Sequence, residues 1–409
     1  MSKMKLILAS GVAPAVMTGA FANVITPIIP DIYAALDVVS RELVGFIPSA
    51  MRAPGVERAA VGQSVKIPTA GDATIVDIAP AMQVPEPADN TFQTTNMAIT
   101  KSRAATFGFT GEEQRALGVG GPGYLTARGM IIANAFRALT NEIERDLAVE
   151  ASANASRAYG TPGTTPFSAA TELTDLAQIK KILDDNGAPR TGRSMVLDTS
   201  AAANLISVKN LTRVNEAGTQ LTLRQGELLD IFGFSIKDSA AAVFHAKGNG
   251  ATVTTSGAAL PVGTTVIPIA AGGTGAVLAG DTITLAGDAN KYVVAPGGGD
   301  GDVSNGGTIR IASPGLRVVV PAAATAITIG NSYSANVGFS QDALCIAMRP
   351  PAIPEEGDLA VDSMMITDPR SGIMFELRVY LGYKKVRYEL GLAWGVKAVK
   401  PAHIALLLG

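Results

Sequence analysis

The residue types that usually carry out catalysis are scarce in this chain. There are two histidines, His245 and His403, which lie far apart in the sequence and outside any H-E-x-x-H spacing. The chain contains no G-x-S-x-G nucleophile elbow and no G-x-x-x-x-G-K-[ST] phosphate loop. We therefore predict no catalytic and no cofactor-binding residue. A hydrolase with an unrecognised site remains as an alternative.

The single cysteine also argues against metal or redox chemistry. Cys345 lies in the apolar run Ala343–Ala347, which predicts a buried and inert thiol. One cysteine cannot form an intramolecular disulfide, and it cannot supply the ligands of a structural zinc site. We therefore expect no metal site of this kind, and a chain that matures in a reducing compartment.

Acidic residues occur in pairs, and one glycine-rich stretch offers several oxygen ligands. The pairs stand in polar surroundings, which favours a solvated surface over a catalytic dyad; they are Glu112-Glu113, Asp184-Asp185 and Glu355-Glu356. In residues 297–307, GGGDGDVSNGG, the side chains of Asp300, Asp302 and Asn305 could bind calcium. Because the calcium repeat is incomplete and occurs once, we predict a glycine-rich hairpin tip, with calcium binding as the alternative.

Three glycines match the G-x-G-x-x-G spacing of dinucleotide-binding loops; they are Gly118, Gly120 and Gly123. Such a loop follows a buried strand, whereas the preceding GEEQRAL is typical of a helix. Pro122 also stands inside the motif. We interpret the glycines as a flexible hinge before a helix.

The composition indicates extensive burial. Of 409 residues, 47% are hydrophobic and 17% are charged, and the formal net charge is −2. The apolar surface must be buried within subunits or between them, and the charge balance gives no sequence-wide signal for nucleic acid. Residues 1–22 resemble a secretory signal interrupted by polar residues and proline, so secretion stays open. We predict no membrane span, because no other stretch has about 20 uninterrupted apolar residues.

The first half of the chain predicts two helices separated by an extended arm. Residues 31–47 carry apolar residues at steps of three and four, which predicts a helix. Residues 56–110 alternate and contain several prolines, which predicts a long two-stranded excursion that is functional or bound to a partner. A second helix is predicted from Leu125 to about Arg157, roughly 50 Å long. Its polar face includes Glu144.

The second half predicts an α/β unit interrupted by a β module. Residues 171–245 alternate between helical and strand patterns. Short strands then recur within residues 248–338, among them the hairpin formed by Thr282–Leu285 and Tyr292–Val294 and a strand at residues 317–322. We expect a small β-barrel or sandwich that is inserted within another domain, because the α/β character resumes after it.

The borders of the module lead to two further predictions. Insertions succeed where their ends lie close together, so strands around Phe234–Ile236 and Leu344–Ala347 should be neighbours in one sheet. The last 40 residues predict two long alternating strands around Gly382. We expect these two strands to belong with the α/β unit.

The order of these elements resembles that of the major capsid proteins of tailed phages, which have the Hong Kong ninety-seven type of fold. More specifically, the chain is similar to the coat-protein family of the short-tailed phage P twenty-two, the gene five product. The similarity covers most of the chain from about residue 22. It is carried by PDIYAALDVVSRELVGFIPSA at residues 30–50, the helix at 125–157, FSQDALCIAMRPP, and SGIMFELRVYLGYKKVRYELGLAWGVKAVKP.

The resemblance implies an α+β fold with an N-arm, an extended loop, a long spine helix, an α/β axial domain and an inserted small β-barrel or sandwich domain. The implied segments are an N-terminal extension (1–21), the N-arm (22–55), the extended loop (56–110), the peripheral domain with the spine helix (111–165), the first part of the axial domain (166–247), the inserted β domain (248–338) and return strands of the axial and peripheral domains (339–409).

The resemblance also implies a structural role without enzymatic activity. Many copies, as pentamers and hexamers, would assemble in the host cytoplasm into the icosahedral head shell of a tailed phage. Assembly would start as a procapsid around a scaffolding protein, with a portal at one vertex. The resulting virion shell would enclose double-stranded DNA without sequence-specific binding, and no membrane is implied. A secreted or surface β-rich adhesin, and a cellular nanocompartment shell of the same fold, stay open as alternatives.

Overall fold

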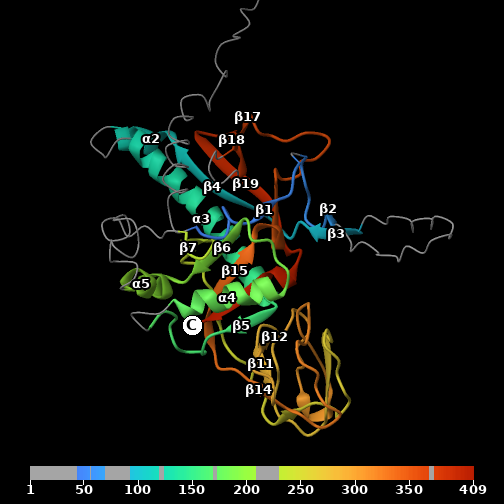
Figure 1. Cartoon of the computed structure of the whole chain (residues 1–409). Coiled ribbons are helices and arrows are strands. Elements are labelled where there is room, and N and C mark those ends of the chain that lie inside the picture. Colours follow the sequence, from blue (N-terminus) through green and yellow to red (C-terminus); the bar gives the residue numbers. More distant parts are fainter. Residues whose placement is uncertain are drawn as a thin grey trace, which may run out of the picture.

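The computed structural model describes residues 44–55, 57–69, 93–118, 124–168, 173–208, 230–367 and 373–409. The α-helices lie between residues 111 and 207, and strands make up most of the other elements, in agreement with the α+β class predicted from the sequence (Figure 1). The helices are α2 (Gly111–Gly118), α3 (Tyr124–Ala153), α4 (Thr174–Asp185) and α5 (Thr199–Ser207), with short 3-10 turns η2 (Val303–Asn305), η3 (Gln341–Ala343) and η4 (Pro401–His403).

The strands belong to two large sheets and two strand pairs. In chain order they are β1 (Met51–Arg52), β2 (Ser64–Thr69), β3 (Gln93–Ala98), β4 (Lys101–Thr110), β5 (Arg157–Tyr159), β6 (Arg193–Leu197), β7 (Phe234–Asp238), β8 (Phe244–His245), β9 (Val253–Thr254), β10 (Val266–Ile269), β11 (Thr282–Leu285), β12 (Lys291–Val293), β13 (Gly307–Arg310), β14 (Ala326–Ile329), β15 (Tyr333–Ser340), β16 (Leu344–Arg349), β17 (Asp362–Thr367), β18 (Met374–Gly382), β19 (Lys385–Ala398) and β20 (Ile404–Leu408).

Helix α3 is the long helix that the sequence predicts. Its 30 residues span about 45 Å. Buried apolar side chains recur every three or four positions along it and form one stripe; they are Ile132, Phe136, Leu139, Ile143 and Leu147. The stripe packs on the six-stranded sheet, where the Phe136 ring meets the Phe375 ring of β18 edge-on at a centroid distance of 4.8 Å.

The six-stranded sheet has the order β1-β16-β19-β18-β17, and β4 also pairs along β19. The long C-terminal strands β18 and β19 therefore lie in this sheet, under α3, and the prediction that they belong with the α/β unit is wrong. The physical reason is that their buried side chains share one hydrophobic cluster with α3; among them are Phe375, Leu377, Leu390 and Leu392.

The second large sheet has ten strands, in the order β7-β6-β15-β20-β5-β12-β11-β14-β9, with β8 beside β15. Its central strand β20 is buried on both faces. Ile404, Leu406 and Leu408 join the cluster that contains the α3 stripe, whereas Ala405 and Leu407 join a second cluster formed with α4 and α5. Because side chains alternate between the faces of a strand, α3 covers one face of this sheet and α4 and α5 cover the other.

The strands β9 to β14, here called the β module, surround a hydrophobic cluster of their own. The predicted hairpin is confirmed, with Thr282 paired to Val293 and Ile283 to Tyr292. The predicted strand at residues 317–322 is wrong, because Val320 forms only an isolated bridge, to Leu260. The following Pro321 has no amide hydrogen for a strand ladder. Strand β12 also pairs with β5, so one sheet runs from the α/β unit into the module.

The strands that flank the module do not become neighbours, which corrects a second prediction. Phe234–Asp238 lies in the ten-stranded sheet beside β6, whereas Leu344–Arg349 lies in the six-stranded sheet between β1 and β19. The strand that returns from the module is β15, which pairs with β6 and β20. The 3-10 turn Gln341–Ala343 then leads the chain from one sheet into the other.

The extended arm predicted at 56–110 is described in part. Its strands β2 and β3 form a separate antiparallel pair that lies to the right of the six-stranded sheet in Figure 1. Strand β4 belongs to the six-stranded sheet instead. Residues 44–50 form turns and not the end of the predicted helix at 31–47. The rest of that helix lies outside the described residues, as do residues 119–123 of the glycine motif.

Candidate assembly interface

The structure keeps the two histidines apart and gives each one a carboxylate partner. His245 Nε2 lies 2.8 Å from the Asp281 carboxylate, and His403 Nδ1 lies 3.4 Å from the Asp342 carboxylate. The Asp281 carboxylate also accepts hydrogen bonds from the amides of Gly248 and Leu278. Asp342 also accepts hydrogen bonds from the Ser340 hydroxyl and from the Lys400 ammonium group.

The paired acids serve different structural purposes. Thr110 and Glu113 form a capping box at the start of α2; the hydrogen bond from the Thr110 amide holds the pKa of Glu113 below its ordinary value. Asp184 binds the buried Arg193 at 2.7 Å, and Asp185 binds the buried Arg157 at 3.3 Å. Glu355 and Glu356 are exposed in the loop before β17.

The glycine-rich stretch forms a local turn in which the acids bind backbone amides. The Asp302 amide donates to the Asp300 carboxylate at 3.0 Å, and the Ser304 amide donates to the Asp302 carboxylate at 3.0 Å. Across the described residues there is no group of three or more His, Cys, Asp or Glu side chains that could hold a metal ion. The Cys345 thiol is buried, and burial raises its pKa to about 11.

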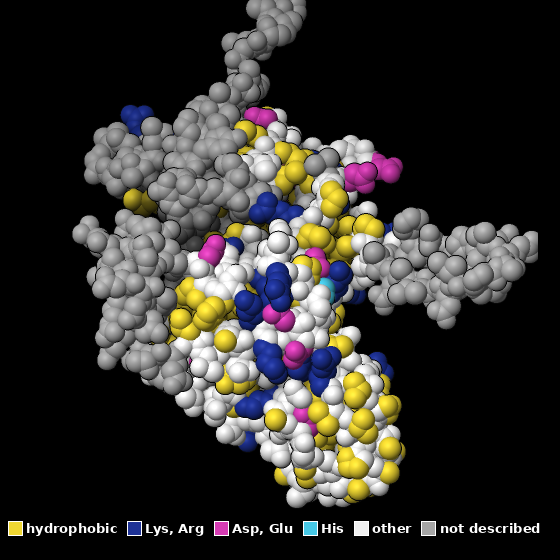
Figure 2. Space-filling view, viewed as in Figure 1, with side chains coloured by type: hydrophobic (Ala, Val, Ile, Leu, Met, Phe, Trp, Pro, Cys, Tyr) yellow, Lys and Arg dark blue, Asp and Glu magenta, His cyan; other side chains and the backbone are white. Residues whose placement is uncertain are grey.

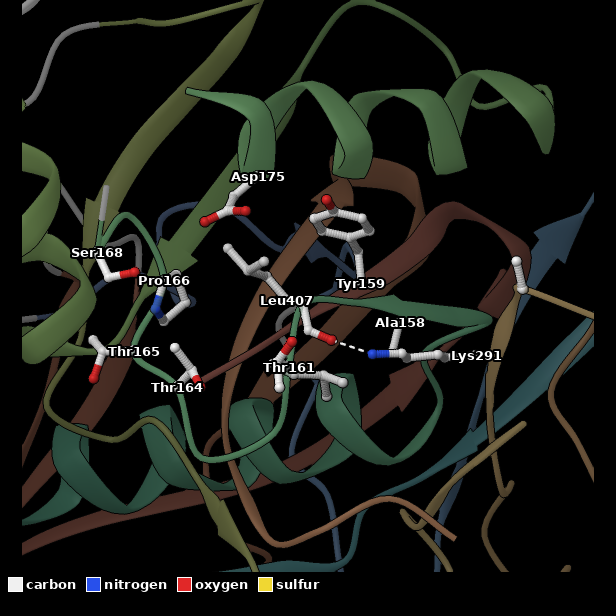
Figure 3. A pocket seen from close by; sticks show the side chains of 13 residues that line it. Ala158, Tyr159, Thr161, Thr164, Thr165, Pro166, Ser168, Asp175, Lys291 and Leu407 are labelled. Atoms are coloured by element: carbon white, nitrogen blue, oxygen red, sulfur yellow. Dashed lines mark hydrogen bonds between the residues drawn. The ribbon is translucent and has the colours of Figure 1, made fainter. Parts of the chain in front are cut away.

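A cavity of about 350 Å³ lies where the β module meets the loop after β5 (Figure 3). Tyr159, Thr161 and Asp175 line it from the α/β unit, and Lys291 lines it from the module. Burial lowers the pKa of Lys291, whose ammonium group donates to the Gly160 carbonyl. Asp175 accepts a hydrogen bond from the Phe167 amide at 2.9 Å. The charged groups thus bind the backbone, and their function here is to join two segments.

One buried carboxylate joins three distant parts of the chain. Glu144 of α3 is 1% exposed and accepts hydrogen bonds from the amides of Gly45, Phe46 and Ile47 at 2.6, 2.8 and 3.0 Å. The Ser239 hydroxyl, just after β7, donates to the same carboxylate at 2.8 Å. Burial raises the pKa of Glu144, and these donors act in the opposite direction.

A second buried carboxylate lies at the root of the arm. Glu376 of β18 is 2% exposed and accepts two hydrogen bonds from the Arg58 guanidinium, at 2.6 and 2.8 Å. Arg378 donates to it at 3.1 Å and also binds Asp358. Planar guanidinium groups bind carboxylates with this bidentate geometry. The start of the arm is therefore fixed to the six-stranded sheet.

The seam between the α/β unit and the β module, meaning the β5–β12 ladder and its surrounding side chains, is polar. The buried Arg157 donates to Asn290 at 3.1 Å and to Asn186 at 3.2 Å. Arg317 donates to the Asp185 carbonyl at 3.3 Å. Figure 2 shows Lys and Arg side chains, with acids among them, gathered across the middle of this face over α4. The seam is therefore held by charged hydrogen bonds as well as by a strand ladder.

Sequence patterns alone could not reveal these joints. Glu144 occupies a position that the helical periodicity assigns to the polar face of α3, so its burial contradicts the prediction. The reason is that the turn at residues 45–47 presents three backbone amides to it. Arg58 and Glu376 lie 318 positions apart, and no spacing motif connects them.

Several solved structures are similar to this one at low sequence identity. Neither a protein-family model nor a curated protein matches it. The structure is similar to the capsid of the cyanophage P-SCSP1u, with 12% identity, a TM-score of 0.49 and coverage of 90% of this chain and 88% of that chain. For the mature capsid of bacteriophage PhiM1 the identity is 9%, the TM-score 0.42 and the coverage 89% and 86%. For a virus-like particle from Pyrococcus furiosus the identity is 10% and the TM-score is 0.38, and the match covers 92% of this chain and 98% of that chain.

Among the described helices, none combines the length and the apolar character that crossing a membrane requires.

Proposed function

We propose that this chain is a major capsid protein, many copies of which assemble into the icosahedral head shell of a tailed phage with a double-stranded DNA genome. The observation that carries the proposal is the order of elements. A two-stranded arm, a long helix on a sheet, an α/β unit, a β module and long return strands follow one another in the order that the sequence resemblance implies.

The arm supports the proposal on physical grounds. Strands β2 and β3 pair only with each other among the described strands, and most of their side chains are exposed. Isolated two-stranded hairpins are marginally stable in water. Ile67 and Met97 pack into a small cluster with Cys345 and Ala393 of the six-stranded sheet, which anchors the root of the arm. We propose that contact with a neighbouring copy stabilises the exposed side chains of these two strands.

The proposed role is structural, and its partners follow from it. Charged side chains in the joints bind backbone groups or each other, as with Glu144, Glu376 and Lys291. We propose that the shell assembles in the host cytoplasm around a scaffolding protein and a portal, and that it encloses DNA without reading its sequence.

Electron microscopy and light scattering of the purified chain, with and without a scaffolding protein, test this function. We expect closed shells of uniform diameter. A chain that remains a well-folded monomer under all assembly conditions contradicts the capsid role. Particles that form but exclude nucleic acid during infection would favour a cellular compartment instead.

A further inference from the structure

The loop before the edge strand β17 presents an apolar side chain within an acidic segment. Residues 354–362 read PEEGDLAVD. The Leu359 side chain is 89% exposed, and Val361 beside it is 45% exposed. Glu355 and Glu356 are exposed on the same loop. Figure 2 shows acidic side chains standing out at the upper right of the molecule, where Figure 1 places the loop that leads into β17.

Hydrogen bonds hold this loop in a fixed position. The Asp358 carboxylate accepts from the Tyr380 hydroxyl at 2.7 Å and from Arg378 at 2.5 Å. The Val361 amide donates to the Val379 carbonyl at 2.9 Å. Leu359 is thus presented by an anchored loop, so that burying it against a partner costs little additional ordering.

The tip of the β18–β19 hairpin has the opposite charge. The segment GYKKVR at residues 382–387 contains three cationic side chains and no acid. Lys384, Lys385 and Arg387 are exposed, and the Tyr383 side chain is 88% exposed. A cavity of about 690 Å³ opens beside this tip; its lining includes Phe109, Leu381, Tyr383 and Val386. The tip therefore combines a mostly apolar cavity with a lining that contains two lysines, Lys384 and Lys385, and one acid, Glu112.

We propose that the loop at residues 354–362 of one copy docks on the β18–β19 tip of a second copy. Leu359 enters the apolar cavity, and Glu355 and Glu356 face Lys384 and Lys385. The second copy is the occupant because this one chain carries both complementary halves, in charge and in apolar shape. Complementary charges of this kind select the partner and its orientation. The proposal rests on the proposed function, which requires contacts between copies.

The sheet order places the loop and the β4 side of the cavity on opposite sides of the β18–β19 hairpin. The loop leads into β17, which pairs with β18, whereas the cavity is lined by the end of β4 and the start of α2, beyond β19. The loop follows the β17 side of β18, where Asp358 binds Tyr380, whereas the cavity lies at the hairpin tip and extends to the β4 side of β19. The proposed contact is heterologous, from the loop of one copy to the tip of the next, and contacts of this type can close into rings.

Charge reversal tests the contact in the full-length chain. One variant carries Glu355→Lys and Glu356→Lys, a second carries Lys384→Glu and Lys385→Glu, and a third combines all four. Each double variant places like charges opposite each other, and we expect the protein concentration needed for shell assembly to rise at least about tenfold. The combined variant should return to within about threefold of the unmodified chain. A control with Lys247→Glu and Arg310→Glu, both exposed near or on the β module, should assemble normally.

Disulfide trapping provides a second, independent readout. The only native cysteine is buried, so chains with Glu356→Cys and chains with Lys384→Cys can be mixed and oxidised in assembled shells. A crosslinked pair between the two kinds of chain is expected. The proposed contact is overturned if the crosslinked pair is absent or if both double variants assemble normally. It is also overturned if charge reversal lowers only the melting temperature of the unassembled chain. If the unmodified chain forms shells, the proposed function still stands.

Discussion

At the residue scale, the molecule depends on buried carboxylates that join distant segments. Glu144 links the turn at residues 45–47 to α3 and to the end of β7, and Glu376 links the arm to β18. A buried carboxylate is costly unless nearly all of its acceptor sites are filled. Both of these residues receive several hydrogen bonds, so each joint stabilises the fold only while its partners stay in place.

Glu144→Gln is expected to lower the free energy of unfolding by about 2–4 kcal/mol, because the new amide group would face backbone donors that need an acceptor. Urea unfolding of the unassembled chain, followed by circular dichroism, measures the change. Glu142→Gln on the same helix is the matched control. Its ion pairs with Lys101 and Arg103 are partly exposed, so it should cost at most about 1 kcal/mol. Equal effects of the two variants would contradict the joint.

Acidification should weaken the root of the arm through Glu376. Burial acts to raise the pKa of Glu376, but hydrogen bonds from Arg58 and Arg378 and their charges outweigh it and hold the pKa below its ordinary value. Stabilisation by the carboxylate is therefore fully present above the ordinary glutamate pKa of about 4.3 and is lost as the pH falls through the lower, folded-state value.

The comparison that reveals this effect is between the unmodified chain and Glu376→Gln, in urea unfolding from pH 7 to pH 3. The difference in unfolding free energy should be constant near neutral pH and should shrink in the acid range. Glu389→Gln, on the neighbouring strand β19, is the control. A difference that stays constant over the whole range would show that the carboxylate charge has no effect there.

At the element scale, α3 positions both sheets because its stripe packs on the six-stranded sheet and its later residues cover one face of the ten-stranded sheet. Its opposite side is largely exposed and carries polar residues together with the apolar Met130 and Val149. A helix with one buried stripe depends on each large side chain in that stripe.

Leu139→Ala should lower the unfolding free energy by about 2–5 kcal/mol, because the 4%-exposed side chain leaves a cavity between α3 and the sheet. Val149→Ala on the same helix removes a side chain that is 46% exposed and should cost less than about 1 kcal/mol. Thermal and urea unfolding of the two variants provide the measurement. If Val149→Ala costs as much as Leu139→Ala, the buried stripe has been placed on the wrong face.

At the scale of the whole molecule, the β module is connected to the α/β unit by a shared ladder and not by a loop alone. Its two ends lie side by side, since the Lys247 amide donates to the Ser332 hydroxyl at 3.1 Å and β8 pairs with β15. The module has its own hydrophobic cluster, and β12 covers the edge of β5. We propose that residues 248–331 form an inserted domain whose orientation the seam fixes, because residues 333–338 of the predicted segment 248–338 belong to β15 of the α/β sheet.

Replacing residues 248–331 with a short glycine linker should leave the α/β unit folded, because the ends already meet. The melting temperature should fall by several degrees, since β5 loses its partner strand β12 and Arg157 loses its hydrogen bond to Asn290 of the module. Circular dichroism on the unassembled variant measures this. Arg157→Lys in the full chain, which keeps the charge but loses the fork of donors, should reproduce part of the loss. A variant that fails to fold would contradict the inserted-domain proposal.

The sequence by itself determined those features that depend on neighbours along the chain. The helical periodicity predicted residues 125–157 and the structure has α3 at Tyr124–Ala153; the alternation in DTITLAG and KYVVA predicted the β11–β12 hairpin. Backbone hydrogen bonds within a helix or a tight hairpin join residues that are close in sequence, so local pattern suffices to identify them.

Only the tertiary structure decided which strands pair across the chain and which charges are buried. Strand β15, and not β16, returns to the α/β sheet, and β18 and β19 lie under α3. The helical spacing assigns Glu144 to the polar face of α3, yet its carboxylate is buried and accepts hydrogen bonds from backbone amides 97 to 99 positions away in the sequence. An alternating pattern shows that a strand has one buried face, but it does not show which helix or sheet that face packs against. That choice depends on how all the apolar faces of the chain pack together.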